Sequence, residues 1–277
     1  MGFFSFFNKN KKLHEATLFH GLDIAKKGID KETSNISSTE IQNKLSNAKM
    51  SDLEISATEH YAKGDFSKAF LLYEELSILK PAEGLYSLGT CYLQGKGTEV
   101  NHTKAFDLFS QATALNYPKA MVSLALCYQM GYGISVNQKK SMELEDSAIS
   151  LNEPFAYFYR AIRYNTGTGV KKNLNQTFKY LSKANIPIAF YSLGYMYKNG
   201  LGTEINHQEA FKFFKKSSES GDPRGMGELI NYYYHIKYGN YDKSQALYWA
   251  EKIYSLSDIL PKMNIERAVN VIKILKS

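Results

Sequence analysis

Asparagine and aspartate residues recur along this 277-residue chain at a nearly constant interval. Each lies four residues before a small residue, and successive separations are 36, 36, 36, 33 and 36 residues. The six are Asp65, Asn101, Asn137, Asn173, Asn206 and Asp242. A side-chain oxygen at an N-cap accepts hydrogen bonds from the free N–H groups at a helix start. The spacing therefore predicts six helices that begin at equivalent points of a repeat, and Gln176 and Glu209 predict a capping box at two of them.

Paired glycines precede four of these caps. They are Gly95 and Gly97, Gly131 and Gly133, Gly167 and Gly169, and Gly200 and Gly202. Two glycines in three residues suit a helix end that needs a positive φ and a close approach of the next segment. A tyrosine lies three residues before each pair, and a leucine lies four residues before that tyrosine, except where Arg160 replaces it. The interval of four puts both side chains on one helical face, which predicts the packing face.

Each repeat is therefore predicted to contain a helix A, a glycine turn and an N-capped helix B. Prolines mark the expected starts of the A helices, where the first turn tolerates them. They are Pro81, Pro118, Pro154, Pro187 and Pro223. Neither helix can bury its apolar stripe alone, so neighbouring pairs must stack. The predicted fold class is all-α, an α-solenoid of about six antiparallel helix pairs.

The repeat resembles a known family. The segments Tyr86–Phe109 and Tyr191–Phe214 are identical at 14 of 24 positions, and both contain the run YSLG followed by Gly-x-Gly-Thr-Glu. This pattern resembles the Sel-one-like repeat (SLR), which is related to the tetratricopeptide repeat (TPR). The resemblance covers about Asp52 to Asp258, and it implies a right-handed superhelix with atypical end units.

The chain is predicted to divide into three parts. Residues 1–50 form an N-terminal helical or linker extension, and residues 51–260 form the SLR/TPR-like solenoid. Residues 261–277 carry apolar side chains at helical spacing and are predicted to be a C-terminal capping helix. Those side chains are Ile265, Val269, Ile272 and Leu275.

Candidate catalytic groups do not form a recognisable constellation. The histidines lack metal-ligand spacing, and no glycine turn follows a strand in the way a phosphate loop does. Glu143, Glu145 and Asp146 are predicted to lie on a solvated helical face. Cys91 and Cys127 are 36 residues apart, on successive A helices, and are predicted to be buried free thiols. The sequence predicts a protein that is not an enzyme and holds neither a cofactor nor a metal ion.

Charge and hydropathy restrict the partners. The 34 basic and 27 acidic residues give a net charge of +7, which favours a partner with an acidic surface. The basic residues are scattered and no nucleic-acid-binding motif occurs, so no nucleic-acid partner is predicted. No stretch suits a membrane span, and a cytoplasmic location is predicted. The phenylalanine-rich start, Phe3 to Phe7, leaves contact with a membrane surface as an alternative.

The family resemblance also implies where a ligand would contact the solenoid. In related tetratricopeptide repeats, the concave groove is lined by helix A positions two before, two after and five after the packing leucine. Arg160 and Arg163 join the candidates because they are charges in a central repeat. The predicted partner-binding residues are Tyr86, Thr90, Gln129, Phe158, Arg160, Arg163, Tyr191, Tyr195, Lys198, Asn231 and Tyr234.

The predicted function is non-enzymatic protein binding in the groove. By resemblance to small signal-free SLR proteins, the chain is predicted to be a bacterial cytosolic immunity protein that neutralises a secreted toxin. A general scaffold or adaptor is the alternative. A β-lactamase-like hydrolase is a further alternative that the residues disfavour, because secreted SLR proteins with that proposed activity carry a cysteine pair in each repeat. The oligomeric state stays open.

Overall fold

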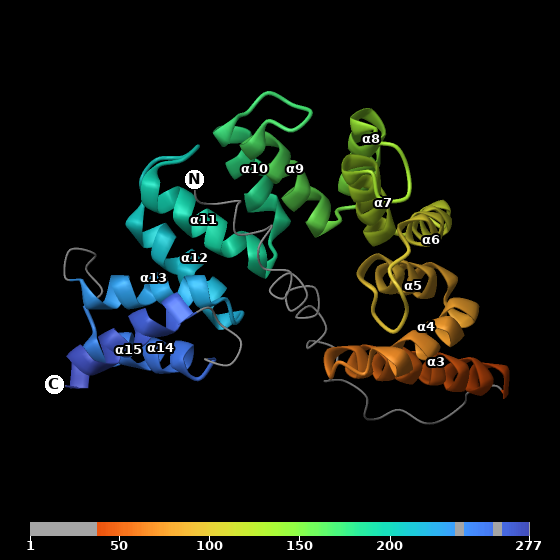
Figure 1. Cartoon of the computed structure of the whole chain (residues 1–277), viewed down its shortest axis with the longest axis horizontal. Helices are drawn as coiled ribbons and strands as arrows, with labels where there is room; N and C mark the ends of the chain where they lie inside the picture. Colours follow the sequence, from red (N-terminus) through yellow and green to blue (C-terminus); the bar gives the residue numbers. More distant parts are fainter. Residues whose placement is uncertain (1–37, 236–240, 257–261, 277) are drawn as a thin grey trace. The chain divides into compact units, whose positions relative to one another are not determined.

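The structure, a computed structural model, describes residues 38–235, 241–256 and 262–276, and these residues form thirteen helices and no strands (Figure 1). The first pairs are α3 (Ser38–Ala62) with α4 (Phe66–Leu79), α5 (Pro81–Gln94) with α6 (His102–Ala114), and α7 (Pro118–Met130) with α8 (Gln138–Ser150). The later pairs are α9 (Pro154–Thr166) with α10 (Leu174–Ala184), α11 (Pro187–Asn199) with α12 (His207–Glu219), and α13 (Pro223–Tyr234) with α14 (Lys243–Tyr254). The last helix is α15 (Lys262–Lys276). The predicted fold class, an all-α stack of helix pairs, is confirmed.

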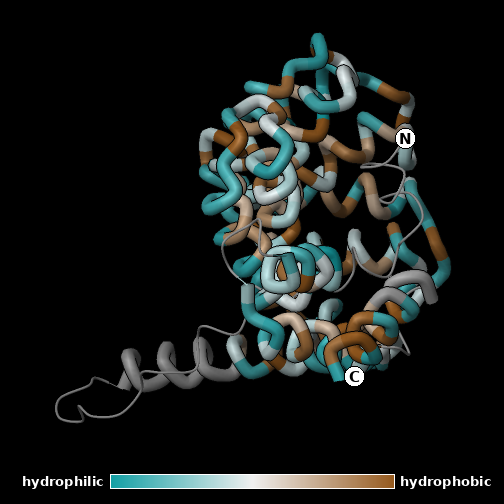
Figure 2. The backbone as a smooth tube through the Cα atoms, turned by 90° about the vertical axis from the view of Figure 1, so that its left-hand side faces the viewer, coloured by the Kyte–Doolittle hydropathy of each residue, from teal (hydrophilic) through white to brown (hydrophobic). Residues whose placement is uncertain are grey.

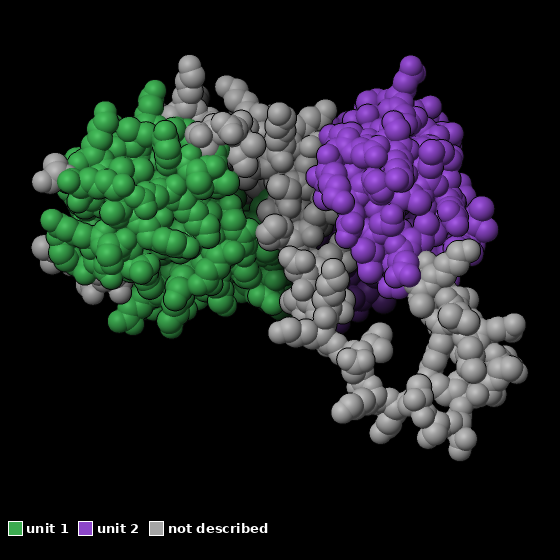
Figure 3. Space-filling model, turned by 90° about the horizontal axis from the view of Figure 1, so that it is seen from below, with its two compact units in different colours: residues 1–17, 157–277 green, residues 18–156 purple. Residues whose placement is uncertain are grey.

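The helices gather into two compact units (Figure 3). In chain order, we call the described part of Leu18–Ala156 the first unit (purple, unit 2 in Figure 3) and the described residues from Tyr157 onward the second unit (green, unit 1 in Figure 3). Within the first unit each helix from α3 to α8 packs on the next, and from α10 to α15 the same holds in the second. The core of each unit is therefore built between consecutive helices, as expected of a repeat.

The six predicted N-caps are confirmed. Each Asn or Asp side chain accepts a hydrogen bond from a backbone N–H in the first turn of its B helix. The predicted capping box is wrong, because the N–H of the cap has another acceptor. The N–H of Asn173 donates to the Tyr164 carbonyl oxygen at 2.8 Å, and that of Asn206 donates to Tyr197 at 2.9 Å. The glycine turn brings the cap residue back beside the last turn of helix A. A backbone carbonyl there has no partner within the helix, and it accepts the hydrogen bond from the N–H of the cap residue.

The paired glycines adopt the predicted conformation. All eight have a positive φ, between 66° and 83°. The second glycine of a turn also touches the start of the preceding B helix. A Cβ on Gly97 would overlap the carbonyl oxygen of Phe66, and one on Gly202 would overlap that of Leu174. The turn thus sets the spacing between neighbouring pairs as well as ending helix A.

On the predicted packing face the leucines are buried and the tyrosines are half-buried. Leu88, Leu124 and Leu193 are at most 7% exposed. The small residue after the leucine admits an aromatic ring of helix B. A Cβ on Gly194 would lie 2.7 Å from the ring of Phe214, and Gly89 lies in the same way against a phenylalanine of α6.

The acidic cluster on α8 was predicted to be solvated, and this is wrong for Glu145. Its side chain is 1% exposed, while Glu143 stays on the surface. The repeat register explains the difference, because Glu145 occupies the position that Phe109 and Phe214 hold in other B helices. A position at the centre of the packing face is buried whatever residue the sequence places there.

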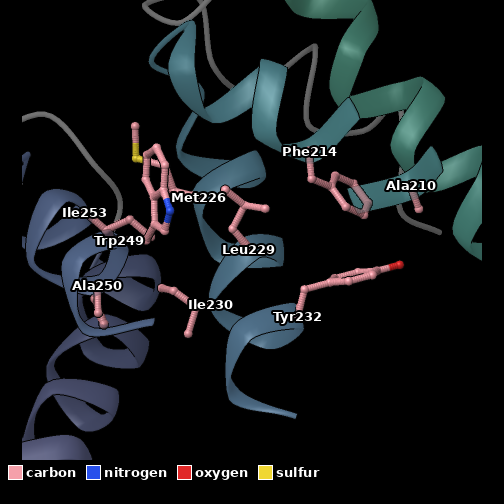
Figure 4. Packing of buried hydrophobic residues seen from close by; sticks show 10 residues of the cluster. Ala210, Phe214, Met226, Leu229, Ile230, Tyr232, Trp249, Ala250 and Ile253 are labelled. Carbon is pink, nitrogen blue, oxygen red and sulfur yellow. The ribbon is translucent and has the colours of Figure 1, made fainter. Parts of the chain in front are cut away.

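The helices at the two ends of the repeat array can be set beside the predicted division into three parts. A boundary at residue 50 falls inside α3, which runs without a break to Ala62. Residues 1–37, including the phenylalanine-rich start, lie outside the described residues. At the other end α15 packs on α14, and Ala268 is buried in one cluster with Trp249 and Ile253 (Figure 4).

The helices carry mixed polar and apolar positions. Hydrophobic and hydrophilic residues are interspersed along the described chain (Figure 2). No described helix combines the length and the hydropathy that crossing a bilayer requires.

Candidate functional site

Five predicted residues of the second unit lie on helices α11 and α13 with part of their surface accessible. They are Tyr191, Tyr195, Lys198, Asn231 and Tyr234. We call them the A-helix site. They belong to A helices of successive repeats, so the repeat itself places them on one side of the stack.

A hollow adjoins this site between α9, α10 and α11. Its volume, counted with the solvent space at its open mouth, is about 520 Å³, and the groove positions of the repeat on its wall are Phe158, Ile162, Asn165 and Tyr195. Its floor includes Leu181, which stands where Phe214 stands in the next repeat. Leucine is shorter than phenylalanine, so the α9–α10 pair leaves space that an aromatic ring fills in the α11–α12 pair. The hollow is mostly apolar and suits one apolar side chain of a partner.

Tyrosine rings and an ion pair order the rest of the site. The rings of Tyr191 and Tyr195 stack with centroids 6.4 Å apart, and the Arg224 guanidinium lies 4.5 Å from the Tyr191 centroid. Lys198 Nζ lies 2.7 Å from Glu228 Oε2, with both side chains mostly buried. Burial raises the pKa of Tyr191 to about 12, so its hydroxyl keeps its proton at neutral pH. The site can therefore offer ring surface and hydroxyl donors to a partner.

The predicted residues of the first unit are engaged in packing. Tyr86 lies between Phe109 and Tyr117, with ring centroids 6.0 and 5.4 Å away. Burial raises the pKa of Tyr86, and its carbonyl oxygen accepts a hydrogen bond from Thr90 Oγ1 at 3.0 Å. Gln129 is half-buried. The A-helix site is half-buried to the same degree, and what distinguishes it is the hollow that Tyr195 lines.

Three further predicted residues are buried. Phe158, Arg160 and Arg163 are 2%, 5% and 1% exposed. The Arg163 guanidinium donates to the Thr168 carbonyl oxygen at 3.5 Å, within the turn that follows its helix. Arg160 and Arg163 therefore present little surface to a partner, and Phe158 contributes through the wall of the hollow.

Glu228 and Arg224 are members of the site that sequence reasoning did not single out. Glu228 pairs with Lys198 across 30 residues, and Arg224 covers Tyr191 while binding Asp222 at 2.7 Å. Neither residue recurs at the repeat interval, so the periodic pattern of the sequence did not identify them as members of the site.

Histidine and cysteine side chains are used in packing. His207 Nδ1 lies 3.2 Å from the Tyr232 hydroxyl, and the His102 ring lies 4.7 Å from that of Tyr132. Cys91 and Cys127 are buried free thiols, as predicted, and burial raises the pKa of each to about 12. In the described part of the chain, no three His, Cys, Asp or Glu side chains gather as metal ligands would.

Glu153 is a buried carboxyl group that gives a pH-dependent prediction. Its side chain is 7% exposed and accepts a hydrogen bond from the Phe155 N–H at 3.3 Å. Burial raises its pKa above the usual 4.5. The folded state therefore holds the proton more tightly than the unfolded state, and stability falls as pH rises through and above the unfolded pKa.

We expect Glu153→Gln, which keeps the hydrogen-bond acceptor, to raise the Tm at pH 7. A gain of about 2–4 °C corresponds to about 1 kcal/mol in a domain of this size. At pH 3.5 both states hold the proton and the gain should vanish. Melting curves at the two pH values measure this, with the exposed Glu99→Gln as control; a lower Tm at pH 7 would contradict the argument.

The stacked pairs, their glycine turns and the accessible A-helix positions define an α-solenoid repeat protein. The Sel1 repeat family model matches five segments, residues 82–117, 118–152, 154–185, 187–222 and 227–258. These cover more than half of the chain, so the chain belongs to the Sel1 repeat family. The first pair, α3 with α4, precedes the matched segments.

Solved structures with the same fold are similar to this chain. A Sel1 repeat protein from Oxalobacter formigenes aligns with a TM-score of 0.61 and 25% identity, over 72% of this chain and 82% of that one. A protective antigen of uropathogenic Escherichia coli with an SLR fold aligns at 0.57 and 23% identity, over 79% and 48%. An immunity protein from Pseudomonas aeruginosa aligns at 0.52 and 16% identity, over 71% and 80%. No curated protein sequence matches the chain.

Proposed function

We propose that this chain is a non-enzymatic protein-binding repeat protein and that the A-helix site of the second unit contacts the partner. The observation that carries this is the stacked Tyr191–Tyr195 pair at the rim of an apolar hollow. Tyrosine combines contact area with a hydrogen-bonding hydroxyl at low entropic cost, which is why it is enriched in energetic centres of interfaces.

The finer proposal is a bacterial cytoplasmic immunity protein that binds and neutralises a cognate toxin. It is supported by the family and by the shared fold of the Pseudomonas aeruginosa immunity protein. A general scaffold or adaptor uses the same site and differs only in the partner. A hydrolase is disfavoured because burial keeps both cysteine thiols protonated, so neither is an activated nucleophile.

The test uses proteins encoded beside the gene, purified and titrated against the chain by calorimetry. We expect one of them to bind, and Tyr195→Ala to weaken that binding by tenfold or more, the loss of about 1.4 kcal/mol or more that is typical of a central tyrosine. Tyr254→Ala is the matched control, because Tyr254 is 52% exposed on a B helix.

Equal binding by the two variants would remove the A-helix site from the interface. If the bound protein is toxic, co-expression should restore growth, and Tyr195→Ala should reduce that rescue. A non-toxic partner with the same dependence on Tyr195 would favour the adaptor.

A further inference from the structure

The positive charge of the chain belongs to its second half. Residues 18–156 contain 13 basic and 17 acidic side chains, a net charge of −4. Residues 157–277 contain 18 basic and 9 acidic side chains, a net charge of +9. The overall net charge of +7 therefore arises from the second unit, whose own net charge is higher than that of the whole chain.

This excess recurs at equivalent positions of the B helices. Five lysines on α10, α12 and α14 occupy two repeat positions, spaced four residues apart on one helical face. We call them the lysine row. They are Lys179 and Lys183, Lys212 and Lys216, and Lys252.

In the first unit the same two positions are acidic or uncharged. They are Leu71 and Glu75 on α4, Asp107 and Gln111 on α6, and Glu143 and Ser147 on α8. Packing does not require lysine at these positions, because the first unit forms the same helix pairs without it. The lysines are therefore a feature of the surface of the second unit.

Aromatic rings lie beneath the row. Lys183 Nζ is 5.9 Å from the Tyr157 ring centroid, Lys216 Nζ is 5.4 Å from that of Phe213, and Lys252 Nζ is 5.0 Å from that of Trp249. Each ammonium group is held near a ring face, which restricts the side chain before any partner arrives. A partner would meet fixed cations and apolar stems together.

Few carboxylates neutralise the row. Lys212 Nζ lies 2.6 Å from Glu209, and Glu251 of α14 pairs with Lys276 instead of Lys252. Among the described residues, Lys179, Lys183 and Lys216 have no carboxylate within ion-pair distance. The three B helices together contain seven lysines and three glutamates, a net charge of +4.

We propose that the lysine row is a second interaction surface, which binds an acidic surface of a partner protein. It lies on B helices, whereas the A-helix site lies on A helices, so the two surfaces use different elements. Glutamates and aromatic rings interrupt the lysines, and this mixed pattern suits the mixed polar and apolar surface of a protein better than the uniform charge of a phosphate backbone. Complementary charge of this kind accelerates association and selects the partner.

The probe is immobilised poly-L-glutamate, with a 20-base-pair DNA duplex and phosphatidylserine vesicles as parallel arms at equal salt. We expect the chain to bind poly-L-glutamate at 20 mM salt. Lys183→Gln/Lys216→Gln/Lys252→Gln should weaken this binding about tenfold, and 0.15 M salt should reduce the difference because exposed charges are screened. All three side chains lie on the protein surface, so circular dichroism should be unchanged.

The matched control carries the same change of net charge on first-unit B helices, Lys68→Gln/Lys139→Gln/Lys140→Gln. It should change binding by less than twofold. Equal losses in the two triple variants would overturn the proposal, because only net charge would then matter. Tighter, row-dependent binding to DNA or to vesicles would also overturn it. Tyr195→Ala should leave poly-L-glutamate binding unchanged, which separates this surface from the A-helix site.

Discussion

Gly202→Ala is expected to destabilise the chain by more than about 3 kcal/mol, among the largest effects of a single methyl group. Two causes combine. Gly202 has a φ of +70°, where an L-residue is strained by roughly 1–2 kcal/mol. In addition, its new Cβ would overlap the Leu174 carbonyl oxygen, a backbone atom that cannot move without shifting α10.

A second glycine of the same unit separates these causes. Gly221 has a φ of +87°, and nothing lies within 4 Å of a Cβ placed there. Gly221→Ala should therefore cost only the conformational part, about 1–2 kcal/mol. Urea denaturation of both variants measures the difference. Equal losses would mean that the turn does not set the spacing between the α9–α10 pair and the α11–α12 pair.

Phe214→Ala is expected to cost about 3–5 kcal/mol, because the ring is fully buried and leaves a cavity. Its centroid lies 5.9 Å from that of Tyr191 and 5.8 Å from that of Tyr232, at one end of the cluster that continues to Trp249 (Figure 4). Denaturation by urea, followed by far-ultraviolet circular dichroism, measures the loss. Ile205→Ala is the control, since Ile205 is 63% exposed and should change stability by less than about 0.5 kcal/mol.

The contact between Gly194 and Phe214 can be tested by a double-mutant cycle. The equivalent positions of the α9–α10 pair hold Ala161 and Leu181: alanine is larger than Gly194, and leucine is smaller than Phe214. Gly194→Ala should destabilise the wild-type chain, but it should change stability little when it is introduced into the Phe214→Leu variant. The two substitutions should therefore be coupled by about 0.5–3 kcal/mol. Additive losses would show that the ring does not restrict the glycine.

The periodic part of the fold could be predicted because each periodic residue has a local task. Asn101 caps the helix that follows it, and Gly95 ends the helix before it with a positive φ. Neither task depends on distant residues. The capping box failed because the spacing that predicts it is local, whereas the competing acceptor, the Tyr197 carbonyl, lies nine residues upstream across the turn.

The candidate site was less predictable, since exposure depends on neighbours. The same repeat rule selected Tyr195, which borders the hollow, and Tyr86, which is packed against Phe109 and Tyr117. Both are tyrosines at predicted groove positions, but at different places in the repeat, and Tyr191, the equivalent of Tyr86, packs on Phe214 as Tyr86 packs on Phe109. Glu145 is a further example. Its charge predicted a solvent-exposed side chain, but its position in the repeat places the side chain in the buried packing face.

The sequence by itself determined the helix pairs, their starts and ends, and the stripe that stacks them, because short-range hydrogen bonding and helical periodicity act within a few residues. The tertiary structure alone decided which repeated positions stay open to a partner. It opened the hollow beside Tyr195, paired Lys198 with Glu228, and placed Lys183 over the ring of Tyr157. These features depend on the packing of side chains that lie far apart in the chain, and no local pattern encodes them.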